Sequence, residues 1–157
     1  MSDRALRLAA AVLALAGAAI AGYLTWAHYA HETVACPIGG GGCETVQESR
    51  YAELAGIPVA LLGLALYVVV LGLLAWDGPQ APSIVAALTL AGLAFALYLL
   101  VVQVAVIDAI CAWCVANDVV IALLSLTAVA RLRTSAPGAA PEARSDPGSP
   151  SGSRPSR

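Results

Sequence analysis

The sequence predicts an all-α integral membrane protein, a bundle of four transmembrane helices, from two observations. First, 60% of the 157 residues are hydrophobic and only 11% are charged, with a mean hydropathy of +0.82. A water-soluble domain of this size exposes much of its surface and could not hide so much apolar side chain. Second, four apolar stretches are each long enough to cross about 30 Å of hydrocarbon, at roughly 20 residues a crossing. The net charge of −2 is uninformative about nucleic acid, but the sequence has no basic patch that could bind phosphate.

The four helices are expected at residues 6–27, 58–76, 83–107 and 110–130. The first could be mistaken for a cleavable signal peptide, but its apolar core exceeds the roughly 7 to 15 residues of such a signal and no clear cleavage site follows it, so we expect a retained helix. Residues 1–133 then form one membrane domain. Residues 134–157 are rich in Pro, Ser, Gly and Ala and are predicted to be a disordered cytoplasmic tail.

Basic residues set the expected orientation of the bundle. Arg4 and Arg7 precede the first helix, and Arg131 and Arg133 follow the fourth. Basic flanks favour the cytoplasmic side, and an even number of crossings returns the chain to it, so both termini should be cytoplasmic. The long segment between the first two helices and the corner before the fourth then lie on the outer face. All four cysteines fall in these outer segments, where disulfides persist.

The segment between the first two helices is predicted to be a loop followed by a short helix. The loop "CPIGGGGC", residues 36–43, should be flexible because its proline and four glycines defeat regular structure. The stretch "ETVQESRYAEL", residues 44–54, has the charge and spacing of a short amphipathic half-helix. Pro58 fits the first turn of the second long helix, and Tyr23 near the end of the first helix suits a membrane interface.

The pair Cys111 and Cys114 indicates a reactive dithiol. The two residues stand at i and i+3, so they share one face in the first turn of the fourth helix, where free N–H groups and the helix dipole favour a thiolate. Asp108, at the corner just before, is expected to cap that helix. The alternative is a static disulfide or two buried thiols. A bridge across two residues constrains little of the unfolded chain, which favours redox chemistry.

The pair Cys36 and Cys43 flanks the glycine loop. The loop lets the two sulfurs meet or separate at small cost, which suits a mobile relay to the other pair. A four-cysteine zinc site is the competing interpretation. Six intervening residues are many for a zinc knuckle, and the exported compartment oxidises thiols, so we expect no metal.

Polar residues within the predicted membrane helices are further candidates. Asp118 follows Cys114 by four positions and points along the same face, about 10 Å deeper than Cys111. An ionisable side chain inside a membrane segment is a functional candidate, and Asn117 lies beside it. Gln103 is expected to hydrogen-bond between helices. His28 and His31 are expected at the membrane interface, where either could help a proton leave.

Four stretches, taken in order, resemble the bacterial homologues of vitamin K epoxide reductase over roughly residues 18–130. They are "YLTWAHY" at the end of the first helix, the two cysteines of the glycine loop, "SRYAELAGIPVALLGL" and "DAICAWCVAND". The resemblance implies a four-helix bundle around a quinone in the bacterial inner membrane. It also implies a thiol oxidoreductase that passes electrons from newly oxidised protein thiols to that quinone and so supports disulfide bond formation.

The resemblance also implies roles for single residues. Cys114 would react with the quinone ring, with Cys111 as its disulfide partner. Cys43 would exchange with Cys111, and Cys36 would take electrons from a soluble protein. Ser49 matches a family serine near the active site, six positions after the second loop cysteine. We place Ser49, Trp113 and Asp118 with Cys114 in the quinone-contacting set, although Asp118 stands at a position that varies in the family.

The expected partner is a separate exported protein. Many bacterial members carry a fused thioredoxin-like domain after the last helix, whereas this sequence continues into a short tail. We therefore expect a thioredoxin-like or DsbA-like partner. A DsbB-like oxidase is disfavoured because that class carries its CxxC in the first outer loop. The alternative from another class is a non-enzymatic membrane protein with structural disulfides or a four-cysteine metal site.

Overall fold

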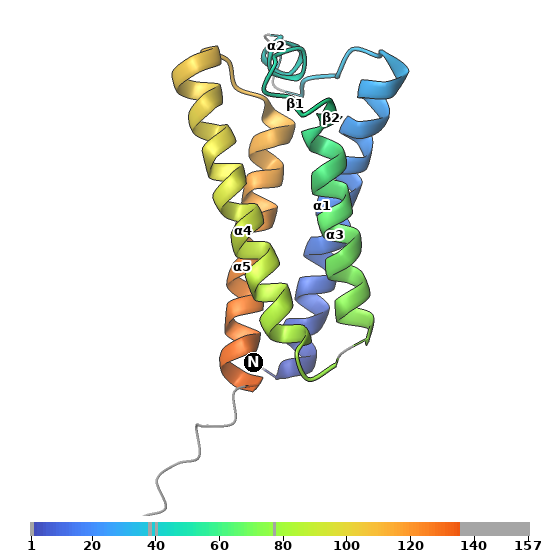
Figure 1. Cartoon of the computed structure of the whole chain (residues 1–157), viewed down its shortest axis with the longest axis vertical. Helices are drawn as coiled ribbons and strands as arrows, with labels where there is room; N and C mark the ends of the chain where they lie inside the picture. Colours follow the sequence, from blue (N-terminus) through green and yellow to red (C-terminus); the bar gives the residue numbers. More distant parts are fainter. Residues whose placement is uncertain (1, 38, 40, 77, 136–157) are drawn as a thin grey trace, which may run out of the picture.

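The computed structural model describes residues 2–37, 39, 41–76 and 78–135, so the predicted tail lies outside the described residues except at its start. The described chain forms four long helices, with three short elements between the first two and a short π-helix between the last two (Figure 1). The long helices are α1 (Asp3–Ala30), α3 (Val59–Trp76), α4 (Ala81–Val102) and α5 (Ala112–Ser135). The short elements are α2 (Gly42–Gln47), β1 (Glu53–Leu54), β2 (Ile57–Pro58) and the π-helix η1 (Gln103–Ile107).

The prediction of a four-helix membrane bundle is confirmed. Four helices are long and apolar enough to cross a membrane, with α4 and η1 counted as one span from Ala81 to Ile107. Large apolar side chains such as Leu8, Val68 and Leu126 are exposed along these helices. Such apolar side chains suit contact with lipid. The helical backbone suits it too, because its polar groups are hydrogen-bonded within the helix. By length and composition the chain is a multi-pass membrane protein.

Helix α1 packs against α3 and α5, and α4 packs against α5 and more lightly against α3. The shared core uses small and branched side chains, including Ala10, Ala14, Val70 and Leu124. Small residues let membrane helices approach closely. The start of α1 and the end of α5 lie at one end of the bundle, which we call the terminal end (Figure 1). Helix α2 and the two short strands lie at the other, which we call the cysteine end.

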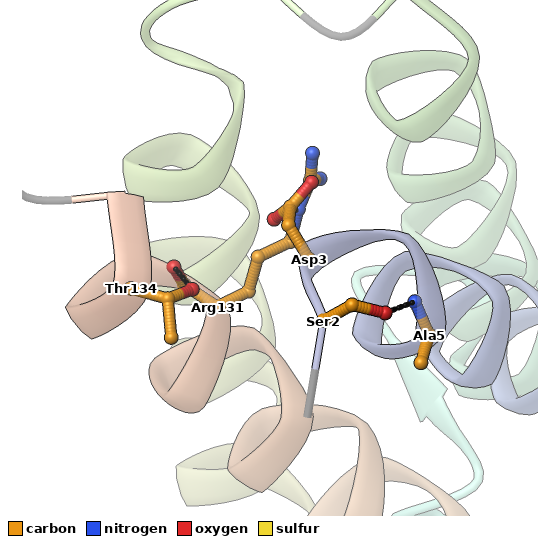
Figure 2. Close-up of polar contacts among 5 residues, drawn as sticks. All are labelled: Ser2, Asp3, Ala5, Arg131 and Thr134. Carbon is orange, nitrogen blue, oxygen red and sulfur yellow. Dashed lines mark hydrogen bonds and ion pairs between the residues drawn. The ribbon is translucent and has the colours of Figure 1, made fainter.

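An ion pair joins the first and last helices at the terminal end (Figure 2). The Nε of Arg131 lies 2.9 Å from Oδ1 of Asp3, and the Arg131 side chain is only 5% exposed. Ser2 caps α1 by accepting a hydrogen bond from the backbone N–H of Ala5, and Thr134 donates its hydroxyl to the carbonyl of Arg131. This pair fixes the two chain ends of the bundle against each other.

Several predicted boundaries differ from the structure. Helix α1 runs from Asp3 to Ala30 because Ser2 caps its start and His31, in the left-handed region at φ 54°, closes its end. Pro58 lies in β2 rather than in the helix that follows. The third membrane span widens from α- to π-geometry at Gln103, and α5 begins at Ala112 rather than at residue 110.

The amphipathic helix predicted for residues 44–54 is shorter than expected. Helix α2 ends at Gln47, and β1 and β2 pair as a small antiparallel hairpin. Its two turn residues, Ala55 and Gly56, both have positive φ, 54° and 80°, as the favoured two-residue hairpin turn requires. The carbonyl of Ala52 accepts from the N–H of Val59. These bonds replace the helical bonds that the sequence pattern predicted.

Candidate active site

Cys111 lies immediately before α5 and caps it. Its carbonyl accepts from the N–H of Val115 at 3.0 Å, and its sulfur accepts from the N–H of Cys114 at 3.3 Å. The expectation that Asp108 caps this helix is wrong. Asp108 instead adopts left-handed geometry, with φ 53°, and ends the π-helix before the corner. The CxxC pair therefore supplies its own helix cap.

The two thiols of this pair are free and in contact. Cys114 donates to the sulfur of Cys111 across 2.7 Å. The hydrogen bond from the Cys114 thiol lowers the pKa of Cys111 below its ordinary value, against the opposing effect of burial, and the Cys114 backbone N–H adds to the lowering. Negative charge is therefore favoured on Cys111. Because Cys111 is 0% exposed, a soluble protein cannot reach this sulfur without movement of the elements above it.

Gln103 fixes the backbone of Cys111. Its Oε1 accepts the Cys111 N–H at 2.9 Å, and both residues are buried. The wider turn of the π-helix begins at Gln103, and such turns are frequent at functional sites. Gln103 was expected to hydrogen-bond between helices. Its partner is the backbone of the first cysteine of the CxxC pair, so it also holds the site.

The second cysteine pair lies against the first. Cys36 and Cys43 form a disulfide. Cys43 is 0% exposed and belongs with Val46 and Cys111 to one buried cluster, while Cys36 is only partly buried beside it. The structure therefore places a disulfide whose outer sulfur is half-buried directly beside the buried sulfur of the CxxC pair.

The glycines between these cysteines do more than loosen the loop. Gly39 and Gly41 have positive φ, 71° and 68°, and Gly42 is the first residue of α2. A β-carbon at Gly42 would lie 2.5 Å from the carbonyl oxygen of Ile110. The sequence suggested that all four glycines defeat regular structure, but Gly42 is helical, and its lack of a side chain lets α2 approach the corner before Cys111.

Trp113 contacts the loop that carries Cys36. Its Nε1 donates to the carbonyl of Ala35 at 2.8 Å, and its ring lies 5.2 Å from that of Tyr23. The hydroxyl of Tyr23 in turn accepts from the N–H of Ala35 at 3.4 Å. Tyr23, expected only as an interface residue, thus helps Trp113 to hold the residue next to Cys36.

A cavity of about 410 Å³ opens beneath α2 and the hairpin, between the four long helices. Its volume lies within the range of about 300 to 1,000 Å³ that small-molecule sites occupy. Most of its walls are apolar. The polar side chains and thiol on its lining are those of Gln47, Ser49, Tyr51, Tyr67, Gln103, Cys114, Asn117 and Asp118. The site thus combines an apolar slot with a reactive sulfur and a few polar groups.

Three of the four residues predicted to contact a quinone line this cavity: Cys114, Ser49 and Asp118. Trp113 is not among the lining residues. Asp118 Oδ2 is buried and has no hydrogen-bond partner among the described residues. The hydroxyl of Ser49 already donates to the carbonyl of Val46 at 2.7 Å, which leaves its oxygen as an acceptor.

The structure adds Tyr67 to the site. Its hydroxyl donates to Oδ1 of Asn117 across 2.9 Å, from α3 to α5. In the sequence, Asn117 stood out only as a neighbour of Asp118, and Tyr67 was not a candidate. The sequence did contain a signal for Tyr67. Its phenol lies in the middle of an otherwise apolar membrane helix, where a buried hydroxyl needs a hydrogen-bond partner.

The four cysteines are not all present as thiols, as a four-cysteine metal site would require. Across the part of the chain that is described, no group of three or more His, Cys, Asp or Glu side chains is arranged to hold a metal ion. The disulfide leaves two of the four cysteines as thiols. His28, expected at the interface, lies with its Nε2 3.5 Å from Glu53 at the cysteine end.

Comparison with known proteins gives two findings. The model of the vitamin K epoxide reductase family matches residues 8–129. Thiol-disulfide oxidoreductase LTO1 of Arabidopsis thaliana is 41% identical over 51 residues, which cover 32% of this chain and 14% of that protein. The match thus spans about one seventh of the length of this curated relative.

Proposed function

The chain belongs to the vitamin K epoxide reductase family, and from this premise we propose that it is a membrane thiol oxidoreductase. In this proposal it reoxidises an exported thioredoxin-like or DsbA-like protein and passes the electrons to a membrane quinone, which is its second substrate. The observation that carries the proposal is the order of the sulfurs. Cys36 is half-buried, Cys43 and Cys111 share one buried cluster, and Cys114 lines an apolar cavity.

The first step is reduction of the loop disulfide. A thiolate of the partner attacks the sulfur of Cys36, the Cys36–Cys43 bond breaks, and Cys43 leaves as a thiolate. The second thiol of the partner then attacks the mixed disulfide, so the partner leaves oxidised and the loop pair holds two electrons. Cys36 is the better target because Cys43 is fully buried.

The second step moves the electrons from the loop pair to an oxidised Cys111–Cys114 pair. Cys43 attacks Cys111 and releases Cys114. Cys36 then attacks Cys43, which reforms the loop disulfide and releases Cys111. The lowered pKa of Cys111 favours this release, because a low-pKa thiol leaves faster. The product is a loop disulfide beside a CxxC dithiol, which is the state that the structure holds.

The third step reduces the quinone. Cys111 and Cys114 together lose two electrons and two protons and form a disulfide, and the quinone gains both and leaves as a quinol. Cys114 is the exit because it lines the cavity, and Cys111 can take the Cys114 proton along the hydrogen bond between them. We assign Ser49 and Asp118 to the cavity wall that faces the ring, and Trp113 to positioning of the Cys36 loop.

The proposal includes an orientation. Both termini are assigned to the cytoplasm and the four cysteines to the outer face of a bacterial inner membrane, where an exported partner is available. The basic residues near both chain ends support this side for the terminal end.

The test uses the full chain, purified in detergent, with a reduced thioredoxin-like protein and either menaquinone or ubiquinone. Quinone absorbance is followed for the wild type, for Cys114→Ala and for the control Ser125→Ala, which removes a buried hydroxyl outside the cavity lining. We expect quinone loss with the wild type and the control and none with Cys114→Ala. Full activity of Cys114→Ala would remove the assigned exit. No reaction of the folded wild type with either quinone would favour a structural or metal-binding protein.

A further inference from the structure

Tyr67 and Asn117 form a polar contact across the cavity wall that the three steps above do not use. Tyr67 is 1% exposed in the middle of α3, and Asn117 lies on α5 three residues after Cys114, one turn away. Both residues line the cavity. Their hydrogen bond of 2.9 Å joins two helices that are 50 residues apart in sequence at this point.

This bond fixes which end of the Asn117 amide is available to a ligand. The hydroxyl of Tyr67 donates to Oδ1, so the carbonyl end of the amide faces α3. The amide nitrogen, with two N–H donors, is at the other end of the group. The neighbouring Asp118 carboxylate, if ionised, would only accept, and the Ser49 hydroxyl has already given its proton to Val46. Asn117 thus adds a neutral donor one turn from Cys114.

We propose that the Asn117 amide donates a hydrogen bond to a carbonyl oxygen of the quinone, and that Tyr67 is a positioning residue that keeps the N–H end of the amide toward that oxygen. The proposal rests on the proposed function. As electrons arrive from the CxxC pair, the carbonyl oxygen gains negative charge, and a fixed N–H donor stabilises it. The opposite amide orientation would present an oxygen to that charge.

Gly17 on α1 makes room for Tyr67. A β-carbon at Gly17 would overlap three carbons of the Tyr67 ring, including Cζ, which bears the hydroxyl. Any side chain at this position must displace the ring and with it the hydroxyl that reaches Asn117. The position of the Asn117 amide therefore depends on a residue of a third helix, far from the cysteines in sequence.

The test measures quinone reduction and loop-disulfide reduction separately in the full chain, for Asn117→Leu, Tyr67→Phe and the double variant. We expect kcat/KM for the quinone to fall about 10- to 100-fold with Asn117→Leu, because a donor to developing charge is lost, and about 3- to 10-fold with Tyr67→Phe. The double variant should be no slower than Asn117→Leu alone, because Tyr67 acts only through Asn117. Reduction of the loop disulfide by the partner should stay unchanged in all three.

Glycine variants keep the test valid where Asn117→Leu does not fold. Gly17→Ala should reproduce the loss caused by Tyr67→Phe, because it displaces the same hydroxyl. Gly22→Ala on the same helix is the matched control, since its new β-carbon would have only a methyl of Leu64 at 4.0 Å. Normal quinone kinetics in folded Asn117→Leu, or multiplied losses in the double variant, would overturn the inference. A wild type that reduces its loop disulfide but no quinone would instead refute the proposed function.

Discussion

The two ends of the bundle are held together in different ways. At the terminal end the helices converge (Figure 1), and Asp3 pairs with Arg131 (Figure 2). The guanidinium of Arg7 also donates to the carbonyl of Ala75 at 3.5 Å. At the cysteine end, the loop that carries Cys36 is joined to α2 by the Cys36–Cys43 disulfide and to α5 by the hydrogen bond from Trp113 to Ala35. The terminal end is fixed by polar contacts between helices, whereas the cysteine end contains a disulfide that thiol exchange can break and remake.

This difference fits a redox function. Thiol exchange needs an attacking sulfur to approach a disulfide, so the elements that carry the loop pair must move. If the helices were joined only at the cysteine end, the whole bundle would open when these elements moved. In the proposed mechanism, the segment that carries the loop pair moves while the contacts at the terminal end stay in place, so that local opening is confined to the end that carries the chemistry.

The largest expected effect is on the rate of quinone reduction, and it distinguishes the role of Cys36 from that of Cys111 and Cys114. Cys36→Ala should slow electron transfer from the protein partner to quinone by at least about 100-fold, because the accessible half of the loop disulfide is lost. A small dithiol that enters the cavity and reduces the Cys114 side directly should still support quinone reduction at close to the wild-type rate. Quinone absorbance with each donor provides the measurement. Equal losses with both donors would argue against a relay through the loop.

The next effect tests whether the terminal end contributes only stability. Arg131→Met removes a nearly buried partner of Asp3, so we expect a loss of about 1 to 3 kcal/mol, less than for a fully buried pair because Asp3 is half exposed. Activity of the folded protein should stay within about 2-fold of wild type. Thermal unfolding in detergent measures the first quantity and quinone reduction at low temperature the second.

The matched control for this variant is Arg133→Met, because Arg133 is exposed in the last turn of the same helix. Its stability should change by less than about 0.5 kcal/mol. If Arg131→Met lowered the rate of the folded protein severalfold while Arg133→Met did not, the two ends would be coupled and the separation drawn above would be incorrect.

A smaller effect concerns the charge on Cys111. With the loop disulfide intact, Cys114→Ser and Cys114→Ala each leave Cys111 as the single free thiol. Serine can still donate to the Cys111 sulfur and alanine cannot, so the pKa of Cys111 should be higher in the alanine variant. The alkylation rate of Cys111 by a small neutral reagent, measured against pH, should rise at higher pH in Cys114→Ala. Identical profiles would show that burial, not the Cys114 thiol, sets this pKa.

The sequence predicted the bundle and the cysteine end because both depend on local patterns. Four apolar stretches specify the helices, and the periods i+3 and i+4 place Cys111, Cys114 and Asp118 on one face. The cavity lining agrees for Cys114 and Asp118. The hairpin was missed because pairing of β1 with β2 competes with helix formation over the same residues, and a two-residue turn decided the outcome.

The contacts that the sequence could not predict join distant residues. Trp113 and Ala35 are 78 positions apart, and Tyr67 and Asn117 are 50 apart. The second pair depends on how α3 and α5 rotate about their axes, which almost uniformly apolar helices do not encode. The first pair depends on how the loop after α1 packs against α5. Capping of α5 by Cys111 was missed for another reason: the sulfur took the place expected for an Asp108 carboxylate.

The smallest expected effect tests whether Trp113 positions the Cys36 loop or contacts the quinone. Trp113→Phe removes the N–H that donates to Ala35 but keeps a ring beside Tyr23. Losing this hydrogen bond should cost about 0.5 to 1.5 kcal/mol in positioning the Cys36 loop. Electron transfer from the loop pair to the CxxC pair should therefore slow by roughly 2- to 10-fold. Quinone reduction by a small dithiol should not change. The control is Trp76→Phe at the terminal end, because Trp76 is 79% exposed and its replacement should not affect either rate. If the quinone step slowed instead and the loop step did not, Trp113 would contact the quinone, as the sequence alone predicted, and the cavity would extend beyond the walls described above.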